Sequence, residues 1–177
     1  MRHDVKKKYL GKEKVSFITT QDIDENSQAE HFVNHALAYL ESAIFLLDNI
    51  EQKKFSESFY HAQVTAFLFQ HSLELFLKGA LLFHSPNYAK NHEPNGLYED
   101  YKKIYCDKQY DFNSQIELAV KNDPHRPYSI YARYPFDKKD NYLWENFSLN
   151  VQRRLEFLNG VLSDFKRIIN QIKISKR

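Results

Sequence analysis

The sequence holds 177 residues, the size of one ordinary domain, and 42% of them are hydrophobic, which is enough apolar material to bury a core. The 25 basic and 23 acidic side chains leave a formal net charge of +2, which excludes a general electrostatic attraction to nucleic acid. The single cysteine, Cys106, cannot form an internal disulfide, which excludes the frameworks typical of small secreted domains.

The chain is expected to be cytoplasmic, with no membrane partner. Its first ten residues are charged and lack the apolar run of a signal peptide. No later stretch approaches the roughly 18 apolar residues of a membrane span. Only four Gly and five Pro are present, so long uninterrupted helices are permitted over most of the length.

An extended arm is predicted over residues 1–24 and one helical domain over 25–177. The first helix should begin at Ser27, because Ser27 and Glu30 have the spacing of a capping box. Apolar residues then recur at steps of three and four as far as Ile50, which indicates one buried helical stripe. The stretch 55–83 predicts a second long helix, because it has no Pro and only one Gly. Its apolar residues, which include Phe59, show the same spacing of three and four.

Three further helices are predicted. A loop over 84–96 precedes a short helix from Leu97 to Tyr105, and a second capping box, Ser114 to Glu117, opens a short helix ending near Val120. Three prolines make 123–136 an irregular loop. The stretch 148–172 has helical periodicity and predicts the last long helix. The expected fold class is therefore all-α, an antiparallel helical bundle of three long and two short helices.

Three segments of the chain resemble the HEPN family of helical bundles. Residues 70–80, Gln-His-Ser-Leu-Glu-Leu-Phe-Leu-Lys-Gly-Ala, are similar to the Gln-Ala-x-Glu-x-x-Leu-Lys-Ala pattern of that family. His92, followed by Leu97 and Tyr101, resembles the family's His-x-Leu-x-x-Leu start of the third helix, with a short insertion. Residues 132–135, Ala-Arg-Tyr-Pro, resemble the Arg-Tyr-Pro element that some members carry before their last helix.

The resemblance implies a HEPN-like module that binds RNA, a nucleotide or a partner protein, in a prokaryotic antiviral defence or toxin–antitoxin setting. It also implies a homodimer. HEPN ribonucleases use an Arg and a His four to six residues apart, and no arginine here (126, 133, 153, 154 or 167) has a His at that distance downstream. Whether the protein is an enzyme therefore stays open. One alternative is a ribonuclease that joins Arg133 or Arg126 with His92 or His125 in space, and another is a helical partner that sequesters a second protein.

His71, Glu74 and Lys78 form the first candidate site. They share one face of the second predicted helix, and Glu74 and Lys78 have the i,i+4 order that stabilises a helix. The functional interpretation is a polar strip lining a groove beneath the Arg133 loop. The alternative is a helix face paired with its neighbours.

The loop carrying Arg126, Tyr131, Arg133 and Tyr134 forms the second candidate site. Arg can bind phosphate oxygens with two hydrogen bonds while aromatic rings stack on bases, so basic and aromatic interleaving is typical of single-stranded RNA or nucleotide sites. The alternative is a loop that its aromatic residues attach to the bundle.

No metal, cofactor or covalent catalysis is expected. His31 and His35 have the i,i+4 spacing of two ligands on one helix, but the sequence supplies no obvious third ligand. Cys106 lacks the basic setting of a nucleophile. The aromatic residues, 12 Tyr, 14 Phe and one Trp, exceed what one core can comfortably cover, which gives an independent reason to expect a homodimer.

Overall fold

The structure is a computed structural model, and it describes residues 28–54, 58–86, 94–120 and 149–176. Every regular element in these ranges is a helix, which confirms the all-α prediction for the described part of the chain. The predicted arm over 1–24 and the predicted loop over 123–136 lie outside the described residues.

Helices α1 (Gln28–Glu51) and α2 (Ser58–His84) form an antiparallel hairpin, as their short connection predicts. The two helices approach closely at Gly79, where an added Cβ would lie 2.7 Å from Cγ2 of Val33 and 3.0 Å from the backbone oxygen of Ala29. Helix α1 ends in a turn in which Lys53 adopts a left-handed φ of 54° and the amide of Lys54 donates to the oxygen of Asn49.

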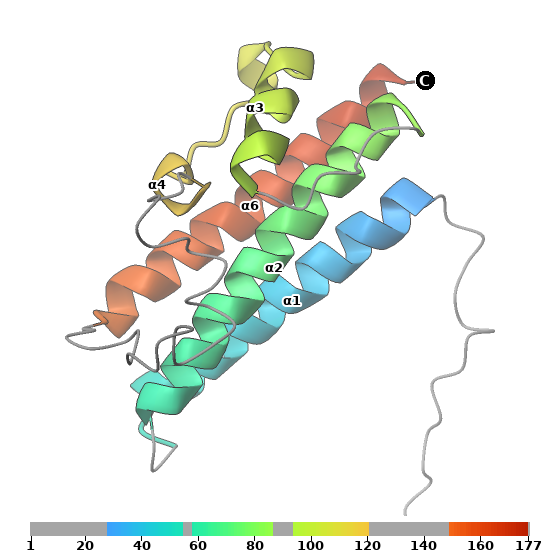
Figure 1. The fold of residues 1–177 in the computed structure, drawn as a ribbon. Coiled ribbons are helices and arrows are strands. Elements are labelled where there is room, and N and C mark those ends of the chain that lie inside the picture. The colour runs from blue at the N-terminus through green and yellow to red at the C-terminus, as the bar shows by residue number, and fades with distance from the viewer. Residues whose placement is uncertain (1–27, 55–57, 87–93, 121–148, 177) are drawn as a thin grey trace, which may run out of the picture.

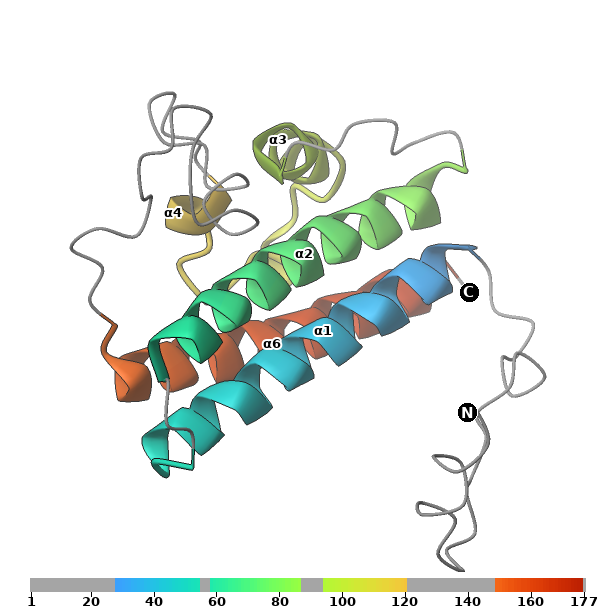
Figure 2. The ribbon, with the colours of Figure 1, turned by 60° about the horizontal axis from the view of Figure 1, so that its bottom comes forward.

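Helix α6 (Val151–Ser175) begins after Asn150, whose side chain accepts a hydrogen bond from the amide of Arg153. It runs antiparallel to α1, because Lys166 pairs with Glu41 and Lys173 with Glu30. Figures 1 and 2 show the three long helices side by side.

Helices α2 and α6 run in the same direction, so the prediction of an antiparallel bundle is wrong for this pair. The ring of Phe69 contacts Phe157, with centroids 5.5 Å apart, and the ring of Phe76 stacks on Phe165 at 3.8 Å, so residue numbers rise together along the two helices. The physical reason is that the chain returns between them, through residues 85–150, to the end of the bundle where α2 begins. The sequence pattern of each helix holds no information on that return.

The chain between α2 and α6 includes three short helices: α3 (Pro94–Ile104), the 3₁₀ helix η2 (Lys108–Tyr110) and α4 (Glu117–Val120). Helix α3 crosses the long helices steeply and is seen end-on in Figure 2. Two side chains of α6 hold the stretch that follows α3. Asp164 accepts a hydrogen bond from the amide of Ser114, and Arg167 donates to the backbone oxygens of Gln109 and Asp111.

Several predicted boundaries differ from the structure. Helix α3 begins at Pro94 and not Leu97, because proline is favoured in the first turn, where its missing amide costs nothing. The second capping box does not form, since Glu117 accepts from the hydroxyl of Tyr98 at 2.7 Å, and α4 begins only at Glu117. Helix α6 is shifted to begin at Val151 and continue to Ser175.

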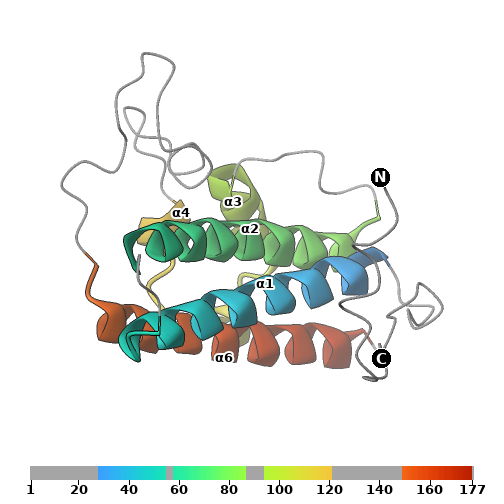
Figure 3. The same cartoon turned by 90° about the horizontal axis from the view of Figure 1, so that it is seen from below.

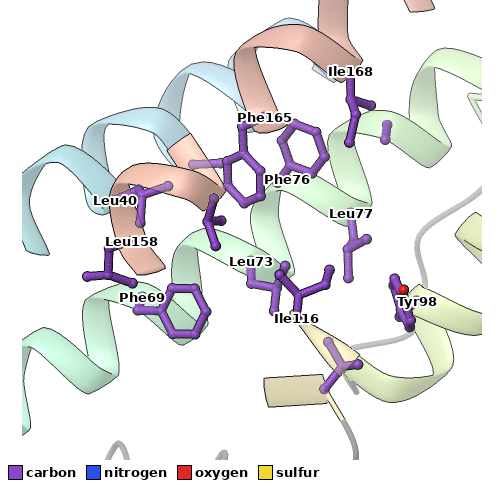
Figure 4. Packing of buried hydrophobic residues seen from close by; sticks show 14 of the residues in the cluster. Leu40, Phe69, Leu73, Phe76, Leu77, Tyr98, Ile116, Leu158, Phe165 and Ile168 are labelled. Carbon is purple, nitrogen blue, oxygen red and sulfur yellow. The ribbon is translucent and has the colours of Figure 1, made fainter. Parts of the chain in front are cut away.

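The core is centred on α2, which packs against α1, α6 and α3 (Figure 4). The largest fully buried side chains come from all of these elements and include Leu40, Phe69, Phe76, Leu97, Tyr101 and Phe165. Phe59, predicted to lie on the buried stripe of α2, is 37% exposed because it precedes the part of the helix that the other elements cover.

Helix α2 is also long and apolar enough to cross a membrane by length and composition, contrary to the expectation that no stretch approaches a span. Most of it is buried inside the bundle, as in the core helix of a soluble protein, so the feature is weak evidence for insertion. Its apolar character follows from having protein neighbours on most sides.

Candidate functional site

The structure describes three of the residues predicted to form a site: His71, Glu74 and Lys78, all on α2. The other predicted site residues, Arg126, Tyr131, Arg133, Tyr134 and His92, lie outside the described residues. The candidate site is therefore built here from α2 and its neighbour α1.

Glu74 and Lys78 form an ion pair inside the molecule. The Nζ atom of Lys78 lies 2.7 Å from Oε1 of Glu74, and the two residues are only 4% and 5% exposed, respectively. The two side chains are thus paired with each other along the helix, as the alternative interpretation expects, and the pair is buried. Spacing alone cannot distinguish a surface pair from a buried one, because burial is set by which elements pack over the helix.

These two residues are the only Asp, Glu, Lys or Arg side chains in α2. The helix has no charged residue from Ser58 to Leu73, so the ion pair stands alone in a helix of otherwise apolar and neutral polar residues. Removing two charges from water costs several kcal/mol per ion, and apolar residues of similar volume often serve stability as well or better. The pair is thus poorly explained by stability alone.

His71 lies one turn before this pair and links it to the surface. Its Nδ1 atom is 3.9 Å from Oε2 of Glu74, and its side chain is 28% exposed. The imidazole stacks on Phe67, with centroids 5.9 Å apart and planes 7° apart, and it meets the ring of Tyr39 from α1 edge-on at 4.7 Å. The ring is held on two sides while part of it reaches solvent.

The three residues form a series from the interior to the surface, Lys78 to Glu74 to His71. The Glu74 carboxylate lies beside the imidazole of His71, 3.9 Å from its Nδ1 atom. Lys78 in turn balances the charge of the buried Glu74 carboxylate. This arrangement can present an imidazole N–H to an anionic ligand.

Comparison of the sequence and structure with known proteins gives no family for the chain. No protein-family model, curated protein or solved structure matches it. The HEPN resemblance therefore stays a prediction from three short segments.

Other chemistry-bearing residues in the described ranges do not assemble a comparable site. His35 is exposed on α1, and no group of three or more His, Cys, Asp or Glu side chains placed to hold a metal lies within these ranges. Cys106 is exposed. Asp164 is buried, but its partners Ser114 and Arg167 tie loops to α6, which is a structural role.

A pocket of about 300 Å³ lies at the far end of the bundle, where α1 begins and α2 and α6 end. It is lined by Gln28, Ala29, Leu82, Phe83, His84, Pro86 and Lys176. His84 is thirteen residues beyond His71, or about 20 Å along the helix, so this pocket is separate from the candidate site.

Two aromatic residues of the site were not predicted from the sequence. Phe67 precedes His71 by four residues, a spacing that places both on one helix face and was a usable signal. Tyr39 lies on the other helix, and only the register of the α1–α2 hairpin brings it to His71. No spacing within the sequence gives that register.

Proposed function

We propose that this protein is a HEPN-like module that binds single-stranded RNA or a nucleotide, with His71 contacting a phosphate group. The observation that carries the proposal is the buried Glu74–Lys78 pair behind a partly exposed histidine, His71. The sequence of 126–139 supports the same ligand class, because arginines and lysines alternate there with tyrosines. A role in prokaryotic defence or a toxin–antitoxin pair is part of this proposal and rests on the resemblance alone.

A phosphate ligand agrees with the charges near His71. A protonated imidazole, the Glu74 carboxylate and the Lys78 ammonium together carry one net positive charge. Charge-assisted hydrogen bonds to phosphate are roughly twice as strong as neutral ones. One such contact gives modest affinity, so Arg126 and Arg133 are proposed to supply the remaining cations.

Fluorescence anisotropy with a labelled single-stranded oligoribonucleotide tests this function. At low salt the wild-type protein should bind, and His71→Ala and Arg133→Ala should each weaken binding about tenfold, the loss of roughly 1.4 kcal/mol. His84→Ala, on the same helix, is the matched control and should bind as the wild type does. Absence of binding by the wild-type protein at low salt would overturn the proposal.

The same preparations, incubated with total RNA, test the ribonuclease alternative. Cleavage that Arg133→Ala abolishes would make the protein an enzyme, with Arg133 at its catalytic centre. Intact RNA together with measurable binding is the result that the proposed function predicts.

Protein association is a second candidate function, and a specific observation favours it. Large hydrophobic side chains stay exposed in the described part of the chain, and four of the five lie on α1 and α2: Phe45, Phe59, Tyr60 and Val64. Exposed apolar surface of this kind marks protein interfaces more often than it marks nucleic-acid sites.

A further inference from the structure

The pocket at the far end of the bundle, called the end pocket below, lies where three long helices begin or end. Helix α1 begins there with Gln28, α2 ends with His84, and α6 ends with Ser175. Figures 2 and 3 show these three helix ends close together. The volume of about 300 Å³ is at the lower limit of small-molecule sites in proteins. The end pocket can therefore hold a small organic molecule.

Apolar side chains form most of the wall of the end pocket. Ala29 and Leu82 are 5% and 8% exposed, so they are the buried part of this wall. Phe83 and Pro86 are more accessible and complete the apolar part. An apolar group that packs against these side chains is removed from water, which is favourable in proportion to the area buried. The wall thus fits a ligand with a hydrocarbon or aromatic body.

The ionisable side chains of the wall favour a ligand with a negative charge. They are Lys176 and His84, and no Asp or Glu is among the described residues that line the end pocket. The Nζ atom of Lys176 lies 6.0 Å from the centroid of the Phe83 ring, beside the apolar wall. Glu30, the carboxylate in the first turn of α1, binds Lys173 at 2.8 Å. Within the described ranges, no carboxylate pairs with Lys176, so its charge is available to a ligand.

The backbone at the three helix ends does not decide the charge of the ligand. Helix α1 presents free amides here, whereas α2 and α6 present free carbonyls, and their partial charges oppose each other. Lysine or histidine near the end of a helix can also bind these carbonyls. In the described part of the chain, neither Lys176 nor His84 donates such a hydrogen bond. The preference for an anion therefore rests on these two side chains.

We infer that the end pocket binds a small organic carboxylate with an apolar body. The carboxylate is placed against the Lys176 ammonium and the His84 imidazole, both of which can donate hydrogen bonds to its oxygens. The apolar body is placed against Leu82 and Phe83. His84 lies about 20 Å along α2 from His71, so this site does not depend on the proposed function.

Nuclear magnetic resonance titration of the full chain with hydrocinnamate, a carboxylate on a phenylpropyl body, tests the inference. Saturable shifts of the amide signals of Ala29, Leu82 and Phe83 should give a dissociation constant of about 1 mM. Two further probes separate the parts of the ligand. Phenylpropylamine has the same body with a positive charge, and inorganic phosphate has negative charge without an apolar body. Each should bind at least about tenfold more weakly than hydrocinnamate.

The variant Lys176→Gln keeps most of the side chain but removes its charge, and it should bind hydrocinnamate about tenfold more weakly. Lys166→Gln is the matched control, because Lys166 lies about 15 Å earlier on α6, where it pairs with Glu41. This variant should bind as the wild type does. Far-UV circular dichroism of both variants, expected to match the wild type, separates loss of binding from loss of fold.

Three results would overturn the inference: no saturable shifts with hydrocinnamate, equal binding of either comparison probe, or equal weakening in Lys176→Gln and Lys166→Gln. His71→Ala should bind hydrocinnamate as the wild type does, because His71 lies outside the end pocket. A chain that binds hydrocinnamate but not RNA would keep this inference and remove the proposed function. A chain that binds RNA but not hydrocinnamate would do the reverse.

Discussion

At the scale of single residues, the buried ion pair of α2 makes the sharpest stability prediction. Lys78→Met leaves the Glu74 carboxylate without its ammonium partner inside the molecule, and such a change costs about 3–5 kcal/mol of unfolding free energy. The double variant Glu74→Leu, Lys78→Met removes both charges and should lose clearly less than the single variant. Urea unfolding measures both. If Lys78→Met is as stable as the wild type, the Glu74–Lys78 ion pair contributes nothing to the free energy of unfolding.

Three buried tyrosines predict a loss of stability at high pH. Burial raises the pKa of Tyr105 to about 12, and burial is also the largest cause of the raised pKa values of Tyr98 and Tyr101. In the unfolded chain tyrosine loses its proton near pH 10, so above that pH the unfolded state binds fewer protons than the folded state. The contribution of these tyrosines to the free energy of unfolding is complete below pH 10. It is lost as pH rises through the raised pKa of each tyrosine in the folded state, which is about 12 for Tyr105.

Each of these tyrosines lowers the unfolding free energy by up to about 1.4 kcal/mol per pH unit in that range. Urea unfolding at pH 9 and pH 11 should therefore give a clearly lower free energy at pH 11. Tyr105→Phe is the control. It should be less stable at pH 9, because the backbone oxygen of Ala80 loses the Tyr105 hydroxyl, but it should lose less between the two pH values. An equal loss in the variant would assign the pH dependence to other groups.

At the scale of helices, the contact of α1 with α2 depends on Gly79. In Gly79→Ala the new methyl would collide with Val33 and with the backbone oxygen of Ala29, and backbone cannot move aside cheaply. We expect a loss of about 1–3 kcal/mol despite the better helix propensity of alanine. Gly160→Ala on α6 is the matched control, since its methyl meets only the Oγ of Ser114, which can rotate away. Thermal unfolding that ranks the two variants in the opposite order would contradict this account of the hairpin.

The long helices could be predicted because each carries its own signal. Apolar residues at helical spacing placed α1 and α2 within a few residues of their observed ends. The start of α3 at Pro94 had a usable local signal, since proline is favoured in the first turn of a helix. The late start of α4 could not be predicted, since Glu117 bonds Tyr98, nineteen residues away, in place of the predicted capping box. Element type is encoded locally, whereas the start of α4 depends on a distant partner.

At the scale of the whole molecule, neither the direction of α6 nor the burial of the site could be predicted. The parallel direction of α2 and α6 depends on how the two helices pack, and spacing along one helix does not give it. The burial of Glu74 and Lys78 depends in the same way on what packs over α2. The sequence therefore predicted which face of α2 carries the polar residues but not their environment.

The proposed function requires that the whole chain bind single-stranded RNA, with the His71 imidazole of α2 against a phosphate group. Native mass spectrometry of the full chain, purified without added nucleic acid and then mixed with a short single-stranded oligoribonucleotide, measures this binding directly. The predicted result is a species that gains the mass of the oligoribonucleotide and loses that gain in His71→Ala. A wild-type species whose mass the oligoribonucleotide leaves unchanged would contradict the proposed function.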